Sequence, residues 1–175
     1  MKKNVLIIAI CAIFAIGLTS CGKPKTATQL LTDKGWVLTE ATVTPAYQVD
    51  TYEFINDCIK DGWFKSWELD DIILFDETGG VKVDPGKLLP TNDWAVYKTL
   101  TSIGTWSFDK EENPEYLSFQ LPWWYNDEYT APDAAVEKCT IVILNETTLR
   151  LRITFDYPEY VAKVNHQFTL EFKHK

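Results

Sequence analysis

Apolar and polar residues alternate over much of the last forty residues of the chain, between Val136 and Lys173. Every second residue is apolar in 148–155, and the same alternation returns in 166–173. A third apolar segment, residues 137–145, precedes these two and is joined to them by a two-residue turn. A period of two over such lengths is typical of antiparallel strands with one buried face. We therefore predict a β-meander whose apolar face is covered by a second sheet or by closure of its own sheet.

The earlier part of the chain carries shorter apolar segments that are separated by polar turns. Residues 76–80 contain two glycines between two such segments, which indicates a β-hairpin. Residues 28–34 predict one or two helical turns that end at Gly35. Repeated short strands with polar turns are typical of an all-β sandwich or barrel. The segments with strand character are Trp36–Thr44, Ile72–Phe75, Val81–Val83, Trp94–Leu100, Gly104–Phe108 and Tyr116–Leu121.

Residues 46–69 do not follow the strand pattern. Apolar side chains recur at roughly helical spacing between Tyr52 and Ile59, so we predict a short helix there, followed by a loop. An insertion of this length between the first two long strands is a position where a lid can sit.

The first twenty residues have the pattern of a secretory signal, with Lys2 and Lys3 followed by the apolar run 5–17. This run is shorter than a membrane-spanning helix needs to be. It ends in Leu18-Thr19-Ser20-Cys21, which resembles the lipobox of bacterial lipoproteins. In that family the cysteine receives a diacylglycerol, the chain is cut just before it, and the new amino group is acylated. The alternative is an ordinary cleaved signal in which Cys21 happens to lie near the cut.

The resemblance to lipoproteins implies a signal peptide in residues 1–20, a tether in 21–28 and a domain in 29–175. Removal of residues 1–20 from the 175-residue chain leaves 155 residues, the size of one ordinary domain. The tether carries no acidic run after Cys21. Such a run is an export signal in some surface-displayed lipoproteins, so we expect the periplasmic face of the outer membrane rather than the cell surface.

Loss of the signal also removes two lysines, which leaves 15 basic and 25 acidic residues and a net charge of −10. A surface of this charge repels nucleic-acid phosphates and gains nothing from anionic lipid headgroups. We therefore expect no nucleic-acid partner, and we expect the acyl chains to hold the protein at the membrane as a monomer. Each buried methylene of such a chain contributes about 0.8 kcal/mol.

Four cysteines are present, of which Cys11 is lost with the signal and Cys21 is the lipid acceptor. Cys58 and Cys139 remain, in a compartment that permits oxidation. A disulfide between them would close a loop of about 80 residues, which is worth roughly 4 kcal/mol in the chain-entropy description. We expect this disulfide, with two buried thiols as the alternative, because spacing alone does not place the two side by side.

Residue types with catalytic potential form no recognisable motif. His166 and His174 lie eight residues apart in or just past one strand, too far apart to share a metal, and we predict both on the surface. No serine or cysteine stands in a nucleophile motif around His166. Asp70 and Asp71 are adjacent, so on a strand they would face opposite ways. We therefore expect no enzymatic activity, no metal ion and no cofactor.

Aromatic residues gather in the two long segments without strand character. Tryptophan and tyrosine side chains in loops often form stacking platforms or binding hot spots. The alternative is that they fold over a barrel and cover its core, which also applies to Phe64. We predict a ligand-binding surface formed by Trp63, Trp67, Trp123, Trp124, Tyr125 and Tyr129.

The order of these segments resembles that of the lipocalin-like lipoproteins of Gram-negative envelopes. This resemblance implies an all-β fold, an antiparallel up-and-down barrel of about eight strands with a short N-terminal helix. The interior of such a barrel holds a small ligand or is filled by side chains. The matching segments are Leu30-Leu31, Gly35-Trp36-Val37-Leu38, Asp70–Phe75, Gly79-Gly80, Gly104–Phe108, Leu144, Thr148-Leu149 and Phe168–Phe172.

Two functions fit such a barrel. The first is a membrane-anchored, non-enzymatic lipoprotein that binds a small apolar or amphipathic ligand inside the barrel. The second is an envelope interaction module that binds a carbohydrate or a protein through its aromatic loops. An apolar cavity that is open at one end favours the first function. A filled barrel with exposed tryptophans favours the second.

Overall fold

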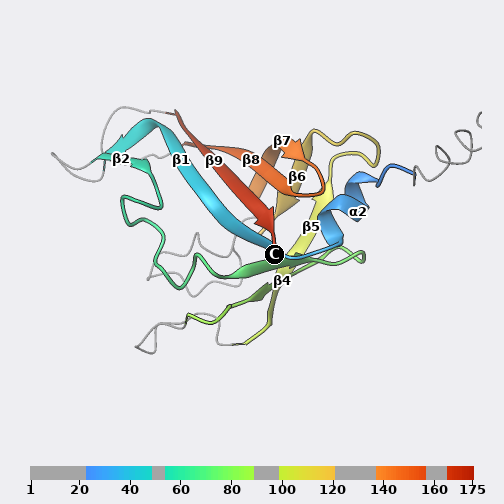
Figure 1. Ribbon diagram of the computed structural model, residues 1–175. Coiled ribbons are helices and arrows are strands. Elements are labelled where there is room, and N and C mark those ends of the chain that lie inside the picture. The colour runs from blue at the N-terminus through green and yellow to red at the C-terminus, as the bar shows by residue number, and fades with distance from the viewer. Residues whose placement is uncertain (1–22, 49–53, 89–98, 121–136, 157–164) are drawn as a thin grey trace, which may run out of the picture.

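The computed structural model describes residues 23–48, 54–88, 99–120, 137–156 and 165–175. Within these ranges the chain forms one short helix and a nine-stranded antiparallel sheet (Figure 1). No helix in the described ranges has both the length and the apolar character needed to cross a bilayer. The elements are α2 (Ala27–Thr32), β1 (Trp36–Gln48), β2 (Phe54–Asp57), β3 (Ile72–Phe75), β4 (Gly80–Asp84), β5 (Thr101–Phe108), β6 (Tyr116–Phe119), β7 (Glu137–Leu144), β8 (Thr148–Asp156) and β9 (Asn165–His174).

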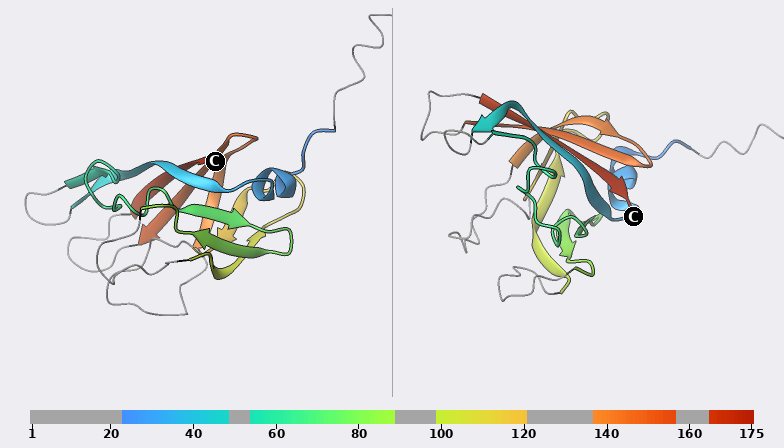
Figure 2. Two further views of the ribbon diagram at one scale, coloured as in Figure 1. Left: turned by 60° about the horizontal axis from the view of Figure 1, so that its bottom comes forward. Right: turned by 60° about the vertical axis from the view of Figure 1, so that its left-hand side comes forward.

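Eight of the nine strands close into a barrel, which Figure 2 shows from two further sides. From β3 to β9, each strand pairs with the next strand in the sequence. β1 completes the ring, because it pairs with β9 over Trp36–Thr44 and with β3 at Trp36. β2 lies outside the ring and pairs with the last part of β1. The prediction of an all-β, up-and-down barrel of about eight strands with a short N-terminal helix is confirmed.

The alternating apolar residues of the last two strands face the barrel interior. Leu149, Leu151 and Ile153 of β8 are each at most 1% exposed, and they pair with Phe172, Leu170 and Phe168 of β9. Burying an aliphatic or aromatic side chain of this size contributes about 1.5–3 kcal/mol. These side chains belong to one continuous apolar cluster that fills the described interior.

One end of the barrel, which we call the closed end, is covered by α2. A capping box begins this helix, because Thr26 accepts from the Gln29 amide while the Gln29 side chain accepts from the Thr26 amide. Leu31 is fully buried, and its carbonyl oxygen accepts a hydrogen bond from Nε1 of Trp36 at 2.8 Å. The His174 ring lies against Trp36, with 3.7 Å between ring centroids. The helix already contains Ala27, so it begins within the predicted tether of residues 21–28.

Residues 54–57 form strand β2, so the prediction of a helix there is wrong. Ile55 points inward from β2, and at Cys58 the chain turns back against β1, where the Cys58 amide donates to the carbonyl oxygen of Ala41 at 2.8 Å. A strand followed by a turn therefore brings Ile55, Cys58 and Ile59 to the core. Their spacing in the sequence resembles that of the buried face of a helix. The predicted strand Trp94–Leu100 lies largely outside the described residues, and Leu100 itself precedes β5.

Cys58 and Cys139 are both buried thiols, so the prediction of a disulfide between them is wrong. Cys58 packs against β1, whereas Cys139 lies in β7 opposite Leu117 of β6. Strands β8 and β9 separate β7 from β1 along the sheet. A disulfide requires Cα atoms within about 7 Å of each other. Neighbouring strands are already about 4.8 Å apart, so positions separated by two further strands along the sheet exceed this limit.

Candidate functional site

The two ends of the barrel are built differently. Consecutive strands run in opposite directions, so the connections between them alternate between the two ends. The turns 76–79, 109–115 and 145–147 lie at the closed end, together with α2. The strand ends that flank residues 49–53, 85–100, 120–136 and 157–164 all lie at the other end. We call this the aromatic end and define it by Tyr47, Phe54, Trp63, His166 and Phe168.

Four of these residues form a ring cluster that joins three parts of the chain. The Tyr47 ring of β1 contacts Trp63 edge-on at 5.2 Å and His166 of β9 at 5.3 Å between centroids. Trp63 in turn contacts Phe168 at 5.8 Å. Edge-to-face pairs contribute about 0.5–1.5 kcal/mol each beyond the area they bury. The cluster therefore fixes the segment around Trp63 against β1 and β9.

His166 is 8% exposed, so the prediction that it lies on the surface is wrong. Its Nδ1 lies 3.0 Å from the carbonyl oxygen of Pro45. A carbonyl oxygen accepts but does not donate, so Nδ1 carries a proton and donates it. His174, also predicted on the surface, is half-buried against Trp36 at the closed end.

Most of the strongly exposed large apolar side chains of the described residues also lie at the aromatic end. Phe54, Leu88 and Leu100 are each more than half exposed. Phe54 begins β2, Leu88 follows β4, and Leu100 precedes β5, so all three lie at strand ends of the aromatic end. The only other large apolar residue of the described ranges with strong exposure is Val142 of β7. Exposed apolar side chains that gather in one region of a soluble domain mark a contact surface.

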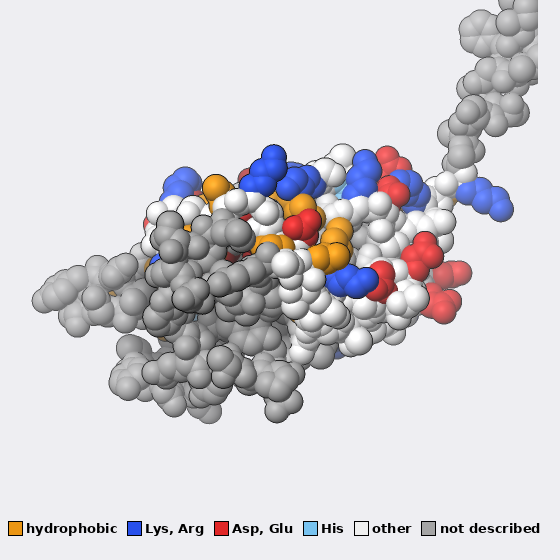
Figure 3. Space-filling view, turned by 90° about the horizontal axis from the view of Figure 1, so that it is seen from below, with side chains coloured by type: hydrophobic (Ala, Val, Ile, Leu, Met, Phe, Trp, Pro, Cys, Tyr) orange, Lys and Arg blue, Asp and Glu red, His pale blue; other side chains and the backbone are white. Residues whose placement is uncertain are grey.

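The space-filling view shows the same asymmetry. In Figure 3 apolar side chains lie next to the undescribed part of the chain, and acidic side chains gather on the opposite side, near the N-terminal residues. Beneath the ring cluster the described interior is filled, and Phe168, Phe119 and Val43 are almost completely buried. The ring cluster therefore lies between the core and this end of the barrel.

Two of the predicted ligand-binding residues lie in the described part of the chain. Trp63 belongs to the ring cluster, and Trp67 is half-buried in the following turn. Phe64 is 6% exposed and belongs to the core, which agrees with the alternative that such residues cover the interior. Cys21 and four predicted ligand-binding residues lie outside the described residues, and these four are Trp123, Trp124, Tyr125 and Tyr129.

Two residues of the cluster were missed although the sequence contains their signal. His166 has the same parity as Phe168, Leu170 and Phe172, so the period of two already places it on the inner face. Tyr47 lies past Pro45, where the first strand was predicted to end, but β1 continues to Gln48.

The described residues contain no group of three or more His, Cys, Asp or Glu side chains that could hold a metal ion. Burial raises the pKa of the Cys58 thiol to about 11, so this sulfur is protonated at neutral pH. Comparisons of the chain with family models, with curated proteins and with solved structures find no match.

Proposed function

We propose that this chain is a lipid-anchored, lipocalin-like binding protein without enzymatic activity, and that it binds a small amphipathic ligand at the aromatic end. The observation that carries this proposal is the difference between the two ends of the barrel. The closed end is covered by α2 and short turns, whereas the aromatic end carries the ring cluster and presents exposed Phe54, Leu88 and Leu100 near the ends of its strands.

The chemistry of the aromatic end suits a ligand with both apolar and polar parts. Covering an exposed phenylalanine or leucine side chain contributes about 1.5–3 kcal/mol. Tyr47 and Trp63 each combine an aromatic ring with one polar hydrogen-bonding group. The side chains that face the described interior are almost completely buried, so we place the ligand at the aromatic end and not inside the barrel, where the sequence predicted it. The exposed tryptophans that would favour the second function are not among the described residues, because Trp63 and Trp67 are half-buried and Trp123 and Trp124 lie outside these residues.

Binding can be measured by titrating the protein with the fluorescent amphipath N-phenyl-1-naphthylamine. We expect Phe54→Ala to weaken binding about threefold to tenfold, because a contact residue of this kind contributes near 1 kcal/mol. Val142→Ala is the matched control, since Val142 is also exposed but lies in the middle of β7. Equal affinity in both variants would place the site elsewhere. Native mass spectrometry of protein from its own host would then identify the natural ligand.

A second candidate function is recognition of a carbohydrate or a protein by the same end. The connection that carries Trp123, Trp124, Tyr125 and Tyr129 starts after β6 and ends at β7, and both strand ends lie at the aromatic end. The double substitution Trp123→Ala with Trp124→Ala is expected to abolish such binding while the urea midpoint stays unchanged. Loss of folding in this variant would instead assign the two rings to the core.

The membrane anchor is a separate part of the proposal and rests on the lipobox-like Leu18-Thr19-Ser20-Cys21. We propose diacylglycerol and an amide-linked acyl chain on Cys21, with the domain on the periplasmic face of the outer membrane. More than one chain makes such an anchor stable, because each chain alone binds only marginally. Cys21→Ser is expected to move the protein from the detergent phase to the aqueous phase in a phase partition experiment. A wild-type protein found in the aqueous phase would contradict the anchor.

A further inference from the structure

The described N-terminal residues join the barrel at its closed end. Residues 23–26 lead directly into α2, whose first turn is capped by Thr26. Lys25 is also held at the helix, because its Nζ lies 2.7 Å from a carboxylate oxygen of Asp33. In Figures 1 and 2 the chain leaves the barrel beside α2, at the side opposite β2 and the end of β1.

The distance that the tether can span is shorter than the barrel. From Cys21 to Thr26 the chain has five residues, which reach at most about 17 Å when fully extended. β9 has 10 residues. At about 3.4 Å per residue and a tilt near 40°, a strand of this length extends about 26 Å along the barrel axis. A barrel turned upside down would need Thr26 to lie that far from the membrane surface.

We infer that the aromatic end never faces the membrane in which the chain is anchored, so its ligand arrives from the aqueous phase and is not a lipid taken from that membrane. This inference rests on the proposed anchor at Cys21. The tether allows an upright barrel and a tilted one, but it excludes a barrel that stands inverted on the membrane, because Thr26 lies at most about 17 Å from the surface. The net charge of −10 in residues 21–175 gives the domain no electrostatic attraction to anionic headgroups.

The test places a fluorophore at either end of the lipidated full-length protein in vesicles. Phe54→Cys puts the label at the aromatic end, and Glu146→Cys puts it in the exposed β7–β8 turn of the closed end. The buried thiols of Cys58 and Cys139 do not compete for the label in the folded protein. The vesicles contain phosphatidylethanolamine and phosphatidylglycerol with brominated acyl chains, which quench only fluorophores close to the bilayer.

We expect the brominated lipids to quench the label at Glu146→Cys and to leave the label at Phe54→Cys unquenched. Stronger quenching at Phe54→Cys than at Glu146→Cys, on protein that is bound to the vesicles, would overturn the inference and leave the anchor intact. Wild-type protein that does not bind the vesicles would overturn the anchor and the inference together.

A longer tether provides the matched control. Inserting twenty Gly/Ser residues between Gly22 and Lys23 gives a linker whose root-mean-square span is about 27 Å, comparable to the length of the barrel. Quenching of the Phe54→Cys label should then rise above its value in the native tether. Quenching that stays unchanged would mean that something other than tether length orients the barrel, which would also overturn the argument.

Discussion

Trp36 connects the helix, the first strand and the end of the last strand. Its ring is completely buried, its Nε1 donates to the Leu31 carbonyl oxygen, and the His174 ring lies on its face. The last carbonyls of a helix lack partners within that helix, so the indole satisfies an acceptor that would otherwise be buried without a donor. The position of a tryptophan at the start of β1 thus determines how α2 closes the barrel.

Replacing Trp36 by phenylalanine keeps most of the ring but removes the donor. We expect Trp36→Phe to lower the free energy of unfolding by about 1–3 kcal/mol, because the Leu31 carbonyl is left buried without a hydrogen bond. Urea unfolding followed by circular dichroism measures this loss. Trp106→Phe is the control, since Nε1 of Trp106 donates a similar hydrogen bond to the carbonyl oxygen of Asp76 at 2.9 Å, but in a half-buried position. Equal losses of unfolding free energy in the two variants would show that burial does not determine the cost of the missing hydrogen bond.

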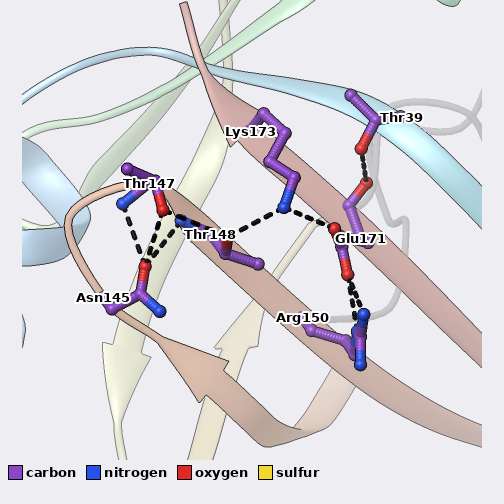
Figure 4. A network of polar contacts seen from close by, with 7 residues as sticks. All are labelled: Thr39, Asn145, Thr147, Thr148, Arg150, Glu171 and Lys173. Carbon is purple, nitrogen blue, oxygen red and sulfur yellow. Dashed lines mark hydrogen bonds and ion pairs between the residues drawn. The ribbon is translucent and has the colours of Figure 1, made fainter.

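Glu171 is a buried carboxylate on the outer face of the barrel (Figure 4). Arg150 of β8 donates to one carboxylate oxygen through Nε at 2.7 Å, and Lys173 lies 2.6 Å from the other. Lys173 also donates to the hydroxyl of Thr148 at 2.9 Å. Glu40 stands opposite Glu171 across β1 and β9, where two like charges would repel. The two cations offset that repulsion and cover the carboxylate.

The hydrogen bond from Lys173, followed by that from Arg150, holds the pKa of Glu171 below its ordinary value of 4.5, although burial opposes this shift. A carboxylate with a lowered folded-state pKa stabilises the protein above its unfolded-state pKa. This stability is lost as the pH falls through the folded-state pKa. We expect Glu171→Gln to be about 1–2 kcal/mol less stable than the wild type at pH 7 and to lose less stability on acidification below pH 4.5.

Urea titrations from pH 7 to pH 3 check this prediction. Glu112→Gln is the matched control because Glu112 is an exposed carboxylate in the turn between β5 and β6, so its curve should keep the wild-type slope. Wild-type and Glu171→Gln curves that run parallel through acid pH would show that Glu171 makes no contribution to the acid response.

At the scale of elements, the wall between β1 and β3 is completed by a segment without strand structure. β1 and β3 share a single residue pair in the described structure, Trp36 with Ile73. Further along β1, the Ala41 carbonyl accepts from the Cys58 amide, and the Cys58 carbonyl accepts from the Phe64 amide at 3.2 Å. The Phe64 side chain is buried in the core at this point. Residues 58–71 therefore cover the barrel where two strands diverge.

This segment should open more readily than the strands around it, because it lacks a continuous ladder of hydrogen bonds. Phe64→Ala removes its buried side chain, and we expect thiol labelling of Cys58 to become about 10- to 100-fold faster, as 1.4–2.8 kcal/mol of local stability is lost. Labelling of Cys139 in β7 should stay at the wild-type rate. Mass spectrometry of peptides after a labelling pulse distinguishes the two cysteines.

Trp67→Ala is the matched control for Phe64→Ala, since Trp67 lies in the same segment but is only half-buried. If Phe64→Ala accelerated labelling at Cys58 and Cys139 equally, the whole barrel would be unfolding. The segment would then have no opening of its own.

The starts of several strands follow from the sequence. β3, β7 and β8 begin where the sequence predicts, and more and less buried positions alternate through β3 and through β8 from Leu149 on. β7 does not alternate regularly, and its register with β8 shifts between Ile141 and Ile143. β2 was missed because its exposed first residue Phe54 and its buried second residue Ile55 are both apolar, so the sequence does not alternate although the burial does. Its pairing with the end of β1 is a tertiary contact that no local pattern contains.

At the scale of the whole molecule, closure of the barrel determines which residues meet. Tyr47 of β1 and His166 of β9 are far apart in sequence and become neighbours because β1 pairs with β9. The aromatic residues of the loops could be recognised from the sequence. The end of the barrel at which they gather follows from the direction of each strand, which becomes known once the strand order is known. Cysteine count alone likewise could not predict that Cys58 and Cys139 form no disulfide.

The absence of a disulfide is testable on the whole protein. Because Cys58 and Cys139 are thiols, we expect the urea midpoint of the purified protein to be the same with and without dithiothreitol. Alkylation after unfolding should modify both cysteines without prior reduction. A disulfide closing a loop of about 80 residues would instead stabilise the oxidised protein by roughly 4 kcal/mol in the chain-entropy description. A urea midpoint that falls on reduction, together with cysteines that can be alkylated only after reduction, would therefore contradict the packing of Cys58 against β1 and of Cys139 in β7.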